Sequence, residues 1–339
     1  MAAGSGPWTE PGAFEVAPGV HRIPLPLPND GLHAVNVYAI ESASGLVLVD
    51  SGWALREARE LLASALGTLG HDLGDVRRFL VTHVHRDHYT LAVEVRRLFG
   101  ARIALGEGER PNLEVIQEGR VTLAGQSMRA WGAEELHAKL RAAFGEGGAS
   151  AAYESPDEWL TAAQRIDLGD RTLEVVPTPG HTRGHVVFVD RAAGLCFAGD
   201  HVLPHITPSI GFEPLRAELP LGDYLDSLRL VRSHPDLRLL PAHGPVAPSV
   251  HARVDELLAH HEDRLAKTLA AVRGGATTAF AAAHALGWTR REREFASLDL
   301  FNQLLATGET ASHLDVLVVR GDLEVVDEDG VREYRLPPR

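Results

Sequence analysis

The chain has 339 residues, 45% hydrophobic and 23% charged, which is long enough for two domains and typical of a soluble globular protein. It carries 33 Lys and Arg against 46 Asp and Glu, and its formal net charge of −13 disfavours a basic surface for nucleic acid or anionic lipid. The single cysteine, Cys196, excludes an intramolecular disulfide and a zinc site built from several thiolates.

The N-terminal sequence MAAGSGPWTEPG has neither the basic region nor the apolar region of a signal peptide. No run in the chain approaches the roughly 18 consecutive apolar residues that would span a bilayer. We therefore expect a cytoplasmic protein that makes no membrane contact.

The first part of the chain alternates strand and helix patterns. The β-patterned runs HRIPLP, AVNVYAIES and GLVLVDSG precede a helical pattern from Ala54 to Leu69, and the strand RRFLVTH follows. Residues 107–164 break this rhythm with helical periodicity and little β character, so we predict a helical cap inserted over the functional cleft. Strand patterns then return in TLEVVPTPG, HVVFVD, GLCFAGD and LRLLPAHG. This order predicts an α/β domain over residues 1–250.

Residues 251–339 are predicted to form a second, helical domain. A long helical pattern from His251 to Val272 precedes further helical segments and the sequence DLEVVDEDGVREYRL, which predicts two strands around an Asp-Gly turn. This outline resembles a winged helix. However, residues 250–339 hold 11 Lys and Arg against 15 Asp and Glu. The helix near residues 310–319, which would contact nucleic acid in a winged helix, contains Asp315 and no Lys or Arg. We expect this domain to pack on the first domain or to mediate dimer contacts, because a reader of nucleic acid needs cations.

Potential metal ligands crowd the end of the strand RRFLVTH. The segment VTHVHRDHYT places His83, His85, Asp87 and His88 within six residues, just before a helical pattern. Imidazole and carboxylate groups together suit zinc or a similar divalent ion, and a strand end fixes their directions while leaving their tips in a cleft. Packing alone does not explain four such residues together, so we predict a metal site here.

Three later motifs end other predicted strands with the same residue types. PTPGHTRGH presents His181, FAGDHV presents Asp200 and LLPAHGP presents His243. In open α/β architectures, functional sites assemble at the ends of strands. We therefore predict that these three residues join the first cluster.

The ordered set of Asp50 in LVLVDSG, the HxHxDH motif, His181, Asp200 and His243 closely resembles the metallo-β-lactamase superfamily, in the style of glyoxalase II. The resemblance covers residues from about 15 to 250. It implies an αββα sandwich with metals at one edge of the two sheets, here with a helical insert and a C-terminal winged-helix-like domain. The layout of the C-terminal region is similar to the branch that includes the lactamase-B-2-like endoribonucleases.

Carried over position by position, the resemblance implies two divalent metal ions, with zinc expected and iron or manganese as alternatives. The expected ligands are His83, His85 and His181 for one ion and Asp87, His88 and His243 for the other, with Asp200 bridging both. Asp50 would orient ligands through hydrogen bonds, and His185 is expected to be a structural hydrogen-bonding residue. His205, in the loop after Asp200, is a candidate for substrate contact.

The implied chemistry is hydrolysis by a metal-bound hydroxide, because the metals lower the pKa of bound water towards about 7. Asp87 would orient this nucleophile and accept its proton, and is therefore the expected catalytic residue. Since the chain is acidic and shows no basic track, we favour a small thioester or related acyl substrate. The alternatives are a single-strand endoribonuclease or phosphodiesterase, a lactonase, and a non-catalytic metal-binding or partner-binding protein. A homodimer is compatible with each of them.

Overall fold

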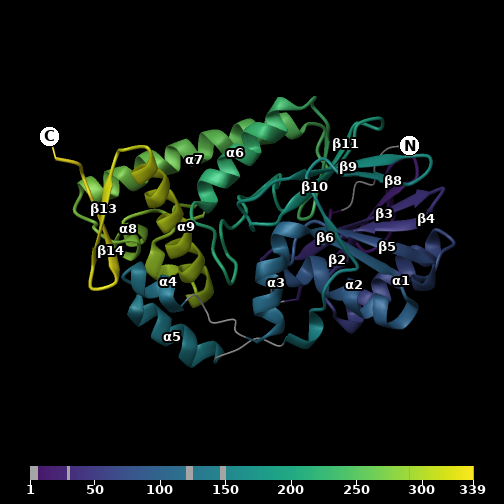
Figure 1. Cartoon of the computed structure of the whole chain (residues 1–339), viewed down its shortest axis with the longest axis horizontal. Coiled ribbons are helices and arrows are strands. Elements are labelled where there is room, and N and C mark those ends of the chain that lie inside the picture. The colour runs from purple at the N-terminus through teal and green to yellow at the C-terminus, as the bar shows by residue number, and fades with distance from the viewer. Residues whose placement is uncertain (1–6, 29–30, 120–124, 146–149, 290, 339) are drawn as a thin grey trace.

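Two β-sheets pack face to face at one end of the molecule, and the C-terminal helices gather at the other end (Figure 1). The computed structural model describes the chain except for residues 1–6, 29–30, 120–124, 146–149, 290 and 339. None of the described helices is both long enough and apolar enough to cross a membrane.

The first sheet has seven strands that follow one another in chain order, antiparallel up to β4 and parallel from β4 to β7. Its strands are β1 (Phe14–Ala17), β2 (Val20–Pro26), β3 (Ala34–Ser42), β4 (Gly45–Val49), β5 (Val76–Val81), β6 (Arg102–Gly106) and β7 (Glu158–Leu160). The apolar runs predicted from the sequence account for β2 to β5. Residues 34–40 of β3 are all buried, as expected for a strand that is covered on both faces.

The second sheet has five strands in the order β12-β11-β10-β9-β8, antiparallel except for the parallel pair β11 and β12. Its strands are β8 (Arg165–Asp167), β9 (Thr172–Pro177), β10 (Val186–Asp190), β11 (Leu195–Gly199) and β12 (Arg238–Pro241). Apolar side chains of both sheets meet in a common core, in which Tyr38 of the first sheet packs edge-on against Phe197 of the second at 5.5 Å between ring centroids.

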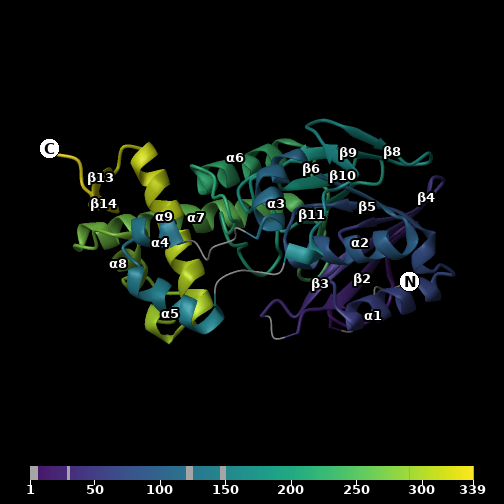
Figure 2. The ribbon, with the colours of Figure 1, turned by 60° about the horizontal axis from the view of Figure 1, so that its bottom comes forward.

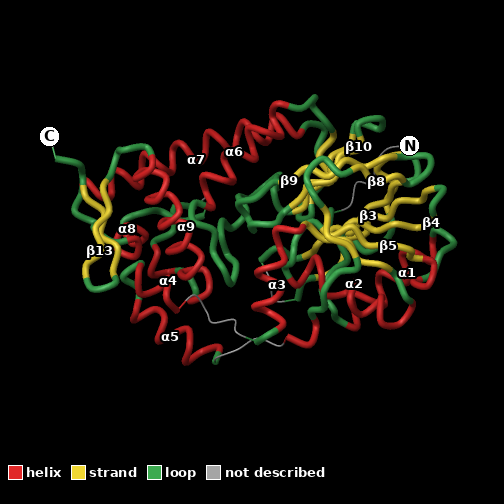
Figure 3. The backbone as a smooth tube through the Cα atoms, viewed as in Figure 1, coloured by secondary structure: helices red, strands yellow, loops and turns green. Residues whose placement is uncertain are grey.

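Helices cover the outer face of each sheet. Helices α1 (Arg56–Thr68), α2 (Arg86–Phe99) and α3 (Arg110–Gln117) pack on the first sheet, while α6 (Pro220–Ser233) and α7 (Val250–Arg273) lie on the second. The resulting order of helix, sheet, sheet and helix is visible in Figure 3, where both sheets are yellow between red helices. The predicted αββα sandwich is therefore confirmed.

The C-terminal residues form helices and one hairpin, as the sequence predicts. After α7 come α8 (Ala279–His284), α9 (Leu300–Val319), β13 (Glu324–Glu328) and β14 (Val331–Arg335). The hairpin turns at Asp329 and Gly330, whose φ angles of 53° and 83° are those a two-residue Asp-Gly hairpin loop requires. The classification of this region as a winged helix, and the domain boundary at residue 250, stay predictions.

The insert that the sequence predicts to be a helical cap has two features that this prediction did not include. The insert contains a strand, β7, which pairs with β6 and belongs to the first sheet. Its helices α4 (Gly125–Ala130) and α5 (Glu134–Phe144) lie beside α8 and α9 rather than over the sheets, as Figures 1 and 2 both show. Their buried side chains, including Trp131 and Leu140, share one apolar cluster with α8 and α9. Burial against these helices explains the helical periodicity that suggested a cap.

Asp315 of α9 ties the C-terminal region to the long segment between β11 and α6. Its carboxylate is 5% exposed, lies 3.1 Å from Arg216 Nη2 of that segment and 2.8 Å from Arg332 Nη1, and accepts a hydrogen bond from the Tyr334 hydroxyl. Removing one member of a buried ion pair leaves the remaining charge without compensation.

We expect Asp315→Ala to lower the free energy of unfolding by about 3 kcal/mol, because Arg216 loses its buried partner. Denaturant titration followed by circular dichroism would measure the change. The matched control is Asp255→Ala, which breaks an exposed pair with Arg232 and should cost less than about 1 kcal/mol. Equal stability of the two variants would contradict the role assigned to Asp315.

Candidate metal centre

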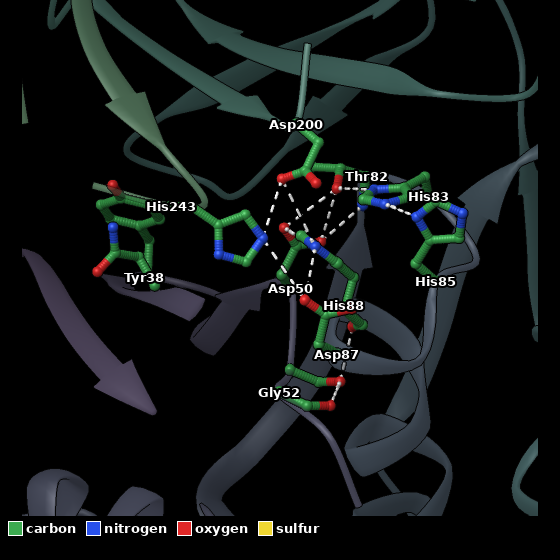
Figure 4. Close-up of polar contacts among 12 residues, drawn as sticks. Tyr38, Asp50, Gly52, Thr82, His83, His85, Asp87, His88, Asp200 and His243 are labelled. Atoms are coloured by element: carbon green, nitrogen blue, oxygen red, sulfur yellow. Dashed lines mark hydrogen bonds and ion pairs between the residues drawn. The ribbon is translucent and has the colours of Figure 1, made fainter. Parts of the chain in front are cut away.

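Seven predicted ligands converge at the edge of the two sheets, from segments that lie far apart in the sequence. All of them except His181 are labelled in Figure 4. The HxHxDH motif runs from the end of β5 into the first turn of α2, while the other three residues follow β9, β11 and β12. Their ligand atoms lie within 4.8 Å of one another in three groups: His83, His85 and His181; His83, His88 and Asp200; Asp87, His88 and His243. Two of these groups are the two trios predicted from the sequence, and Asp200 joins them.

The backbone sets the tautomers of His85 and His181. His85 Nε2 lies 3.0 Å from the Phe212 carbonyl, and His181 Nδ1 lies 2.6 Å from the Ser209 carbonyl. Because a carbonyl only accepts, each of these nitrogens carries the proton. A neutral ring then has a lone pair on His85 Nδ1 and on His181 Nε2, which face each other at 3.0 Å. Two lone pairs repel at this distance, so the arrangement calls for a cation between them.

A chain of hydrogen bonds orients His83 in the same way. The Thr82 hydroxyl lies 3.0 Å from Asp50 Oδ1 and 3.0 Å from His83 Nδ1. The carboxylate can only accept, so Thr82 donates to Asp50 and accepts from His83 Nδ1–H. The lone pair of His83 Nε2 consequently points to His85 Nδ1 at 3.0 Å and to His181 Nε2 at 3.2 Å. Bonds of about 2.0 Å from zinc to three imidazoles require nitrogen separations close to these.

The second trio has the same organisation. His88 Nδ1 lies 2.9 Å from Asp50 Oδ2, and His243 Nδ1 lies 2.7 Å from the Ala34 carbonyl, so the Nε2 atoms of both rings face inward. These two Nε2 atoms and Asp200 Oδ1 are buried and have no hydrogen-bond partner among the described residues. Buried polar atoms are normally paired, so their grouping is the expected signature of a metal-binding site.

Asp200 is placed between the two trios. Its Oδ1 lies 3.6 Å from His88 Nε2 and 3.3 Å from His243 Nε2, whereas its Oδ2 lies 3.5 Å from His181 Nε2. One carboxylate oxygen thus faces each group. This is the geometry a bridging ligand needs.

The charges of the site also favour cations. Burial lowers the pKa of His83 and His181 and lowers that of His85 to about 4, so these rings are neutral, as metal ligation requires. Burial works in the same direction on His88 and His243, but nearby carboxylates, mainly Asp87 for His88 and Asp200 for His243, outweigh it and raise the pKa of each. This half of the site therefore attracts positive charge, which divalent ions would supply.

Asp50 adopts its position because of an unusual backbone conformation. It follows β4 with a φ of 58° and is only 2% exposed. Besides His88 and the Thr82 hydroxyl, its carboxylate accepts the Thr82 backbone N–H at 2.8 Å. Asp50 thus orients His88 directly and His83 through Thr82, which is one ring of each trio. A non-glycine residue held at positive φ is strained, which is common at functional sites.

The two remaining predicted residues lie around this centre. His185 is fully buried, its Nδ1 lies 2.8 Å from the Thr178 hydroxyl, and its Nε2 accepts the backbone N–H of Asp200 at 3.2 Å. This is a structural hydrogen-bonding position, and no metal trio includes the ring. His205 is exposed in the segment after Asp200, close to the turn at Gly244 that follows His243. Its contact with substrate stays a prediction.

Several groups at the centre are not part of any motif that could be recognised in the sequence. Three are the carbonyls of Ala34, Ser209 and Phe212, which any residue type could provide. Thr82 precedes the first ligand directly, and a hydroxyl at that position could have been recognised as a link to Asp50. Buried Glu109, behind the first trio, falls in the segment that the sequence predicts to be a helical cap, where no motif marks it as a site residue.

Comparison with known proteins agrees with this geometry. A family described as the metallo-beta-lactamase superfamily matches residues 30–243, a span that contains the whole cluster. The probable metallo-hydrolase YqjP of Bacillus subtilis is 27% identical over 308 residues, covering 87% of this chain and 90% of that protein. An atrochrysone carboxyl ACP thioesterase of Aspergillus fumigatus is 24% identical over 251 residues, covering 71% of this chain and 46% of the thioesterase. The crystal structure of a beta-lactamase domain protein from Burkholderia ambifaria has 28% identity and a TM-score of 0.79, covering 96% of this chain and 94% of that one.

Proposed function

Because the chain belongs to the metallo-β-lactamase superfamily and is a metal-dependent hydrolase, we propose that it cleaves a small thioester or related acyl compound at a pair of divalent metal ions. The observation that supports the metal pair is the inward orientation of five imidazole lone pairs around Asp200. In this proposal zinc fills the site, since three or four nitrogen and oxygen ligands at these separations suit it.

The residues divide into two ligand sets that share one carboxylate. His83, His85 and His181 would hold the first ion, and Asp87, His88 and His243 the second, with Asp200 shared. When bound, the ions lower the pKa of coordinated water and polarise the scissile carbonyl. The protein's own contribution is to fix each ring through its second nitrogen, so that no reorganisation is needed when substrate arrives.

Asp87 is the carboxylate best placed to act on water. Its side chain is 14% exposed, compared with 8% for Asp200 and 3% for Asp50. Its Oδ2 lies 3.5 Å from both His88 Nε2 and His243 Nε2. These neighbouring imidazoles outweigh the opposing effect of burial and hold the pKa of Asp87 well below its ordinary value. An ionised carboxylate at this position can accept a hydrogen bond from the attacking water and orient it.

The choice of an acyl substrate rests on three observations. One relative carries the name of a thioesterase. The chain has a formal net charge of −13, which would repel RNA. In addition, residues 310–317 of α9, the segment expected to read nucleic acid in a winged helix, are all buried. A small acyl compound is thus favoured over a nucleic acid.

A substrate panel tests the proposal. The metal-loaded protein would be assayed with a short-chain acyl thioester, an ester, a lactone and a phosphodiester, each with the parent and with Asp87→Ala. We expect the thioester to be cleaved fastest, and we expect Asp87→Ala to lower kcat by about 10²-fold or more, the scale of losing a positioned acid or base. The control is Asp167→Ala, an exposed aspartate in β8. Equal rates for the parent and Asp87→Ala on every substrate would remove the proposed role of Asp87, and a preference for the phosphodiester would replace the acyl proposal.

A further inference from the structure

Glu109 is a fully buried carboxyl group that the mechanism above does not use. It ends a short 3-10 helix, η2 (Glu107–Glu109), that follows β6 directly. Its Oε1 accepts a hydrogen bond from the Thr182 hydroxyl, and the carboxyl group also lies near the backbone N–H of Val84. Val84 lies between His83 and His85, and Thr182 follows His181. A single side chain thus holds both segments that provide the first trio.

Backbone packing leaves Glu109 little freedom to lie elsewhere. A Cβ added at Gly184 would overlap the backbone nitrogen of Glu109, and a Cβ added at Gly106 would overlap the Gly184 carbonyl. A Cβ at Gly108 would lie 2.8 Å from Gly184 Cα. The η2 backbone therefore packs directly on the loop that follows His181, and only glycine fits at these three positions. This contact places the Glu109 side chain behind the ligands.

The surroundings of Glu109 favour its neutral acid form. Burial, with a smaller contribution from the negative charge of Glu213, raises the pKa of Glu109 to about 8. Its Oε2 has no hydrogen-bond partner among the described residues. A neutral carboxyl is less costly to bury in such a place than an ion. What this side chain offers its neighbours is therefore hydrogen-bond acceptance rather than charge.

Glu213 extends the same arrangement to the third segment of the site. Its carboxylate accepts the backbone N–H of Arg183 at 3.0 Å and a hydrogen bond from the Asn112 amide. The residue before it, Phe212, provides the carbonyl that orients His85. The start of α3, the loop after His181 and the Phe212 segment are thus joined behind the first trio.

We propose that Glu109 is a positioning residue for the metal ion that His83, His85 and His181 would hold, acting through its hydrogen bond to Thr182 and its packing against the Val84 backbone. This inference rests on the proposed metal-dependent function. Loss of these two contacts frees the His83–His85 turn and the His181 loop to move apart, although no ligand is removed. Supporting hydrogen bonds of this kind change metal affinity by about 10-fold to 100-fold.

The test is a metal titration of the full-length apoprotein with cobalt(II) and with zinc(II) against a chromophoric chelator. Glu109→Ala should lower the affinity for one of the two metal ions by about 10-fold to 100-fold and leave the affinity for the other unchanged. Glu109→Gln keeps an acceptor oxygen in a neutral group and should retain the parent affinity. Glu107→Ala, at the exposed first residue of η2, is the matched control. The cobalt absorption spectrum reports the geometry around the weakened ion, which a general loss of stability would not alter selectively.

Thr182→Val provides a second variant that creates no large cavity. It removes the hydroxyl that donates to Glu109. It should lower the affinity for the same metal ion as Glu109→Ala does, by about 10-fold. Three results would each overturn the inference. Glu109→Ala could bind metal with the parent affinity, or it could weaken the binding of both metal ions equally. Glu109→Gln could also lose as much affinity as Glu109→Ala. If the parent protein binds neither metal, the proposed function itself fails, and that result differs from all of these.

Discussion

Replacing Asp200 by alanine is expected to reduce kcat/KM by about 10³-fold or more, the scale of removing a group that stabilises charge in the transition state. The two oxygens of Asp200 face different trios, at 3.3 Å from His243 Nε2 and 3.5 Å from His181 Nε2. Its loss removes a negative charge from between two proposed cations, which would then repel each other. Both metal ions should bind more weakly, whereas Glu109→Ala is expected to weaken the binding of one metal ion.

Elemental analysis and steady-state kinetics of the same preparations would measure both effects. Asp200→Asn retains the shape of the side chain but not its charge, and it should resemble Asp200→Ala if the charge is what matters. Asp226→Ala is the control, because Asp226 is 80% exposed and pairs with Arg229 one turn away. Full metal content together with parent activity in Asp200→Asn would show that Asp200 does not bridge the two groups.

The convergence of the seven proposed ligands could be predicted from the sequence because each lies in a short motif that begins at or just after the end of a strand. His83, His181, Asp200 and His243 follow apolar runs whose strand character is clear, and strand ends of packed sheets meet at one edge. The local sequence pattern therefore indicated both the residue type and its position at the end of a strand. No tertiary contact had to be known in advance.

The groups that orient the ligands could not be predicted in the same way. The carbonyls of Ser209 and Phe212 belong to an irregular segment, where neither periodicity nor side-chain type marks a position. Arg216 holds this segment through its ion pair with Asp315, about a hundred residues later in the chain. Such contacts depend on tertiary packing, which has no local signal in the sequence.

The insert shows how a correct local pattern can leave the position of a helix open. Its helical periodicity is real, and α4 and α5 bury residues such as Trp131 and Leu140. Periodicity indicates that one face of a helix is buried but does not identify the partner. The partner of α5 is α9, and α4 packs on α5 and β14. The tail and the second part of the insert consequently share one apolar core.

Asp50→Asn is expected to lower kcat by about 10² to 10⁴-fold, a range that extends from loss of a supporting hydrogen bond to fixation of the wrong histidine tautomer. In the parent, Asp50 accepts from Thr82 N–H at 2.8 Å and from His88 Nδ1 at 2.9 Å. An asparagine must keep its oxygen towards Thr82 N–H, so its NH₂ group faces His88 Nδ1. His88 would then accept at Nδ1 and carry its proton on Nε2, which can no longer bind a metal.

The nitrogen chemical shifts of His88 distinguish the two tautomers directly and would be measured with metal content and kcat. The expected result is that His88 is protonated at Nε2 and that the metal ion held by Asp87, His88 and His243 is lost. The trio that contains His83 should still bind its metal ion. That trio is spared because the asparagine oxygen still accepts from the Thr82 hydroxyl, which orients His83. Thr82→Ser, which keeps the hydroxyl, serves as the control and should behave like the parent. An unchanged His88 tautomer accompanied by full activity would mean that Asp50 does not set the direction of this ring.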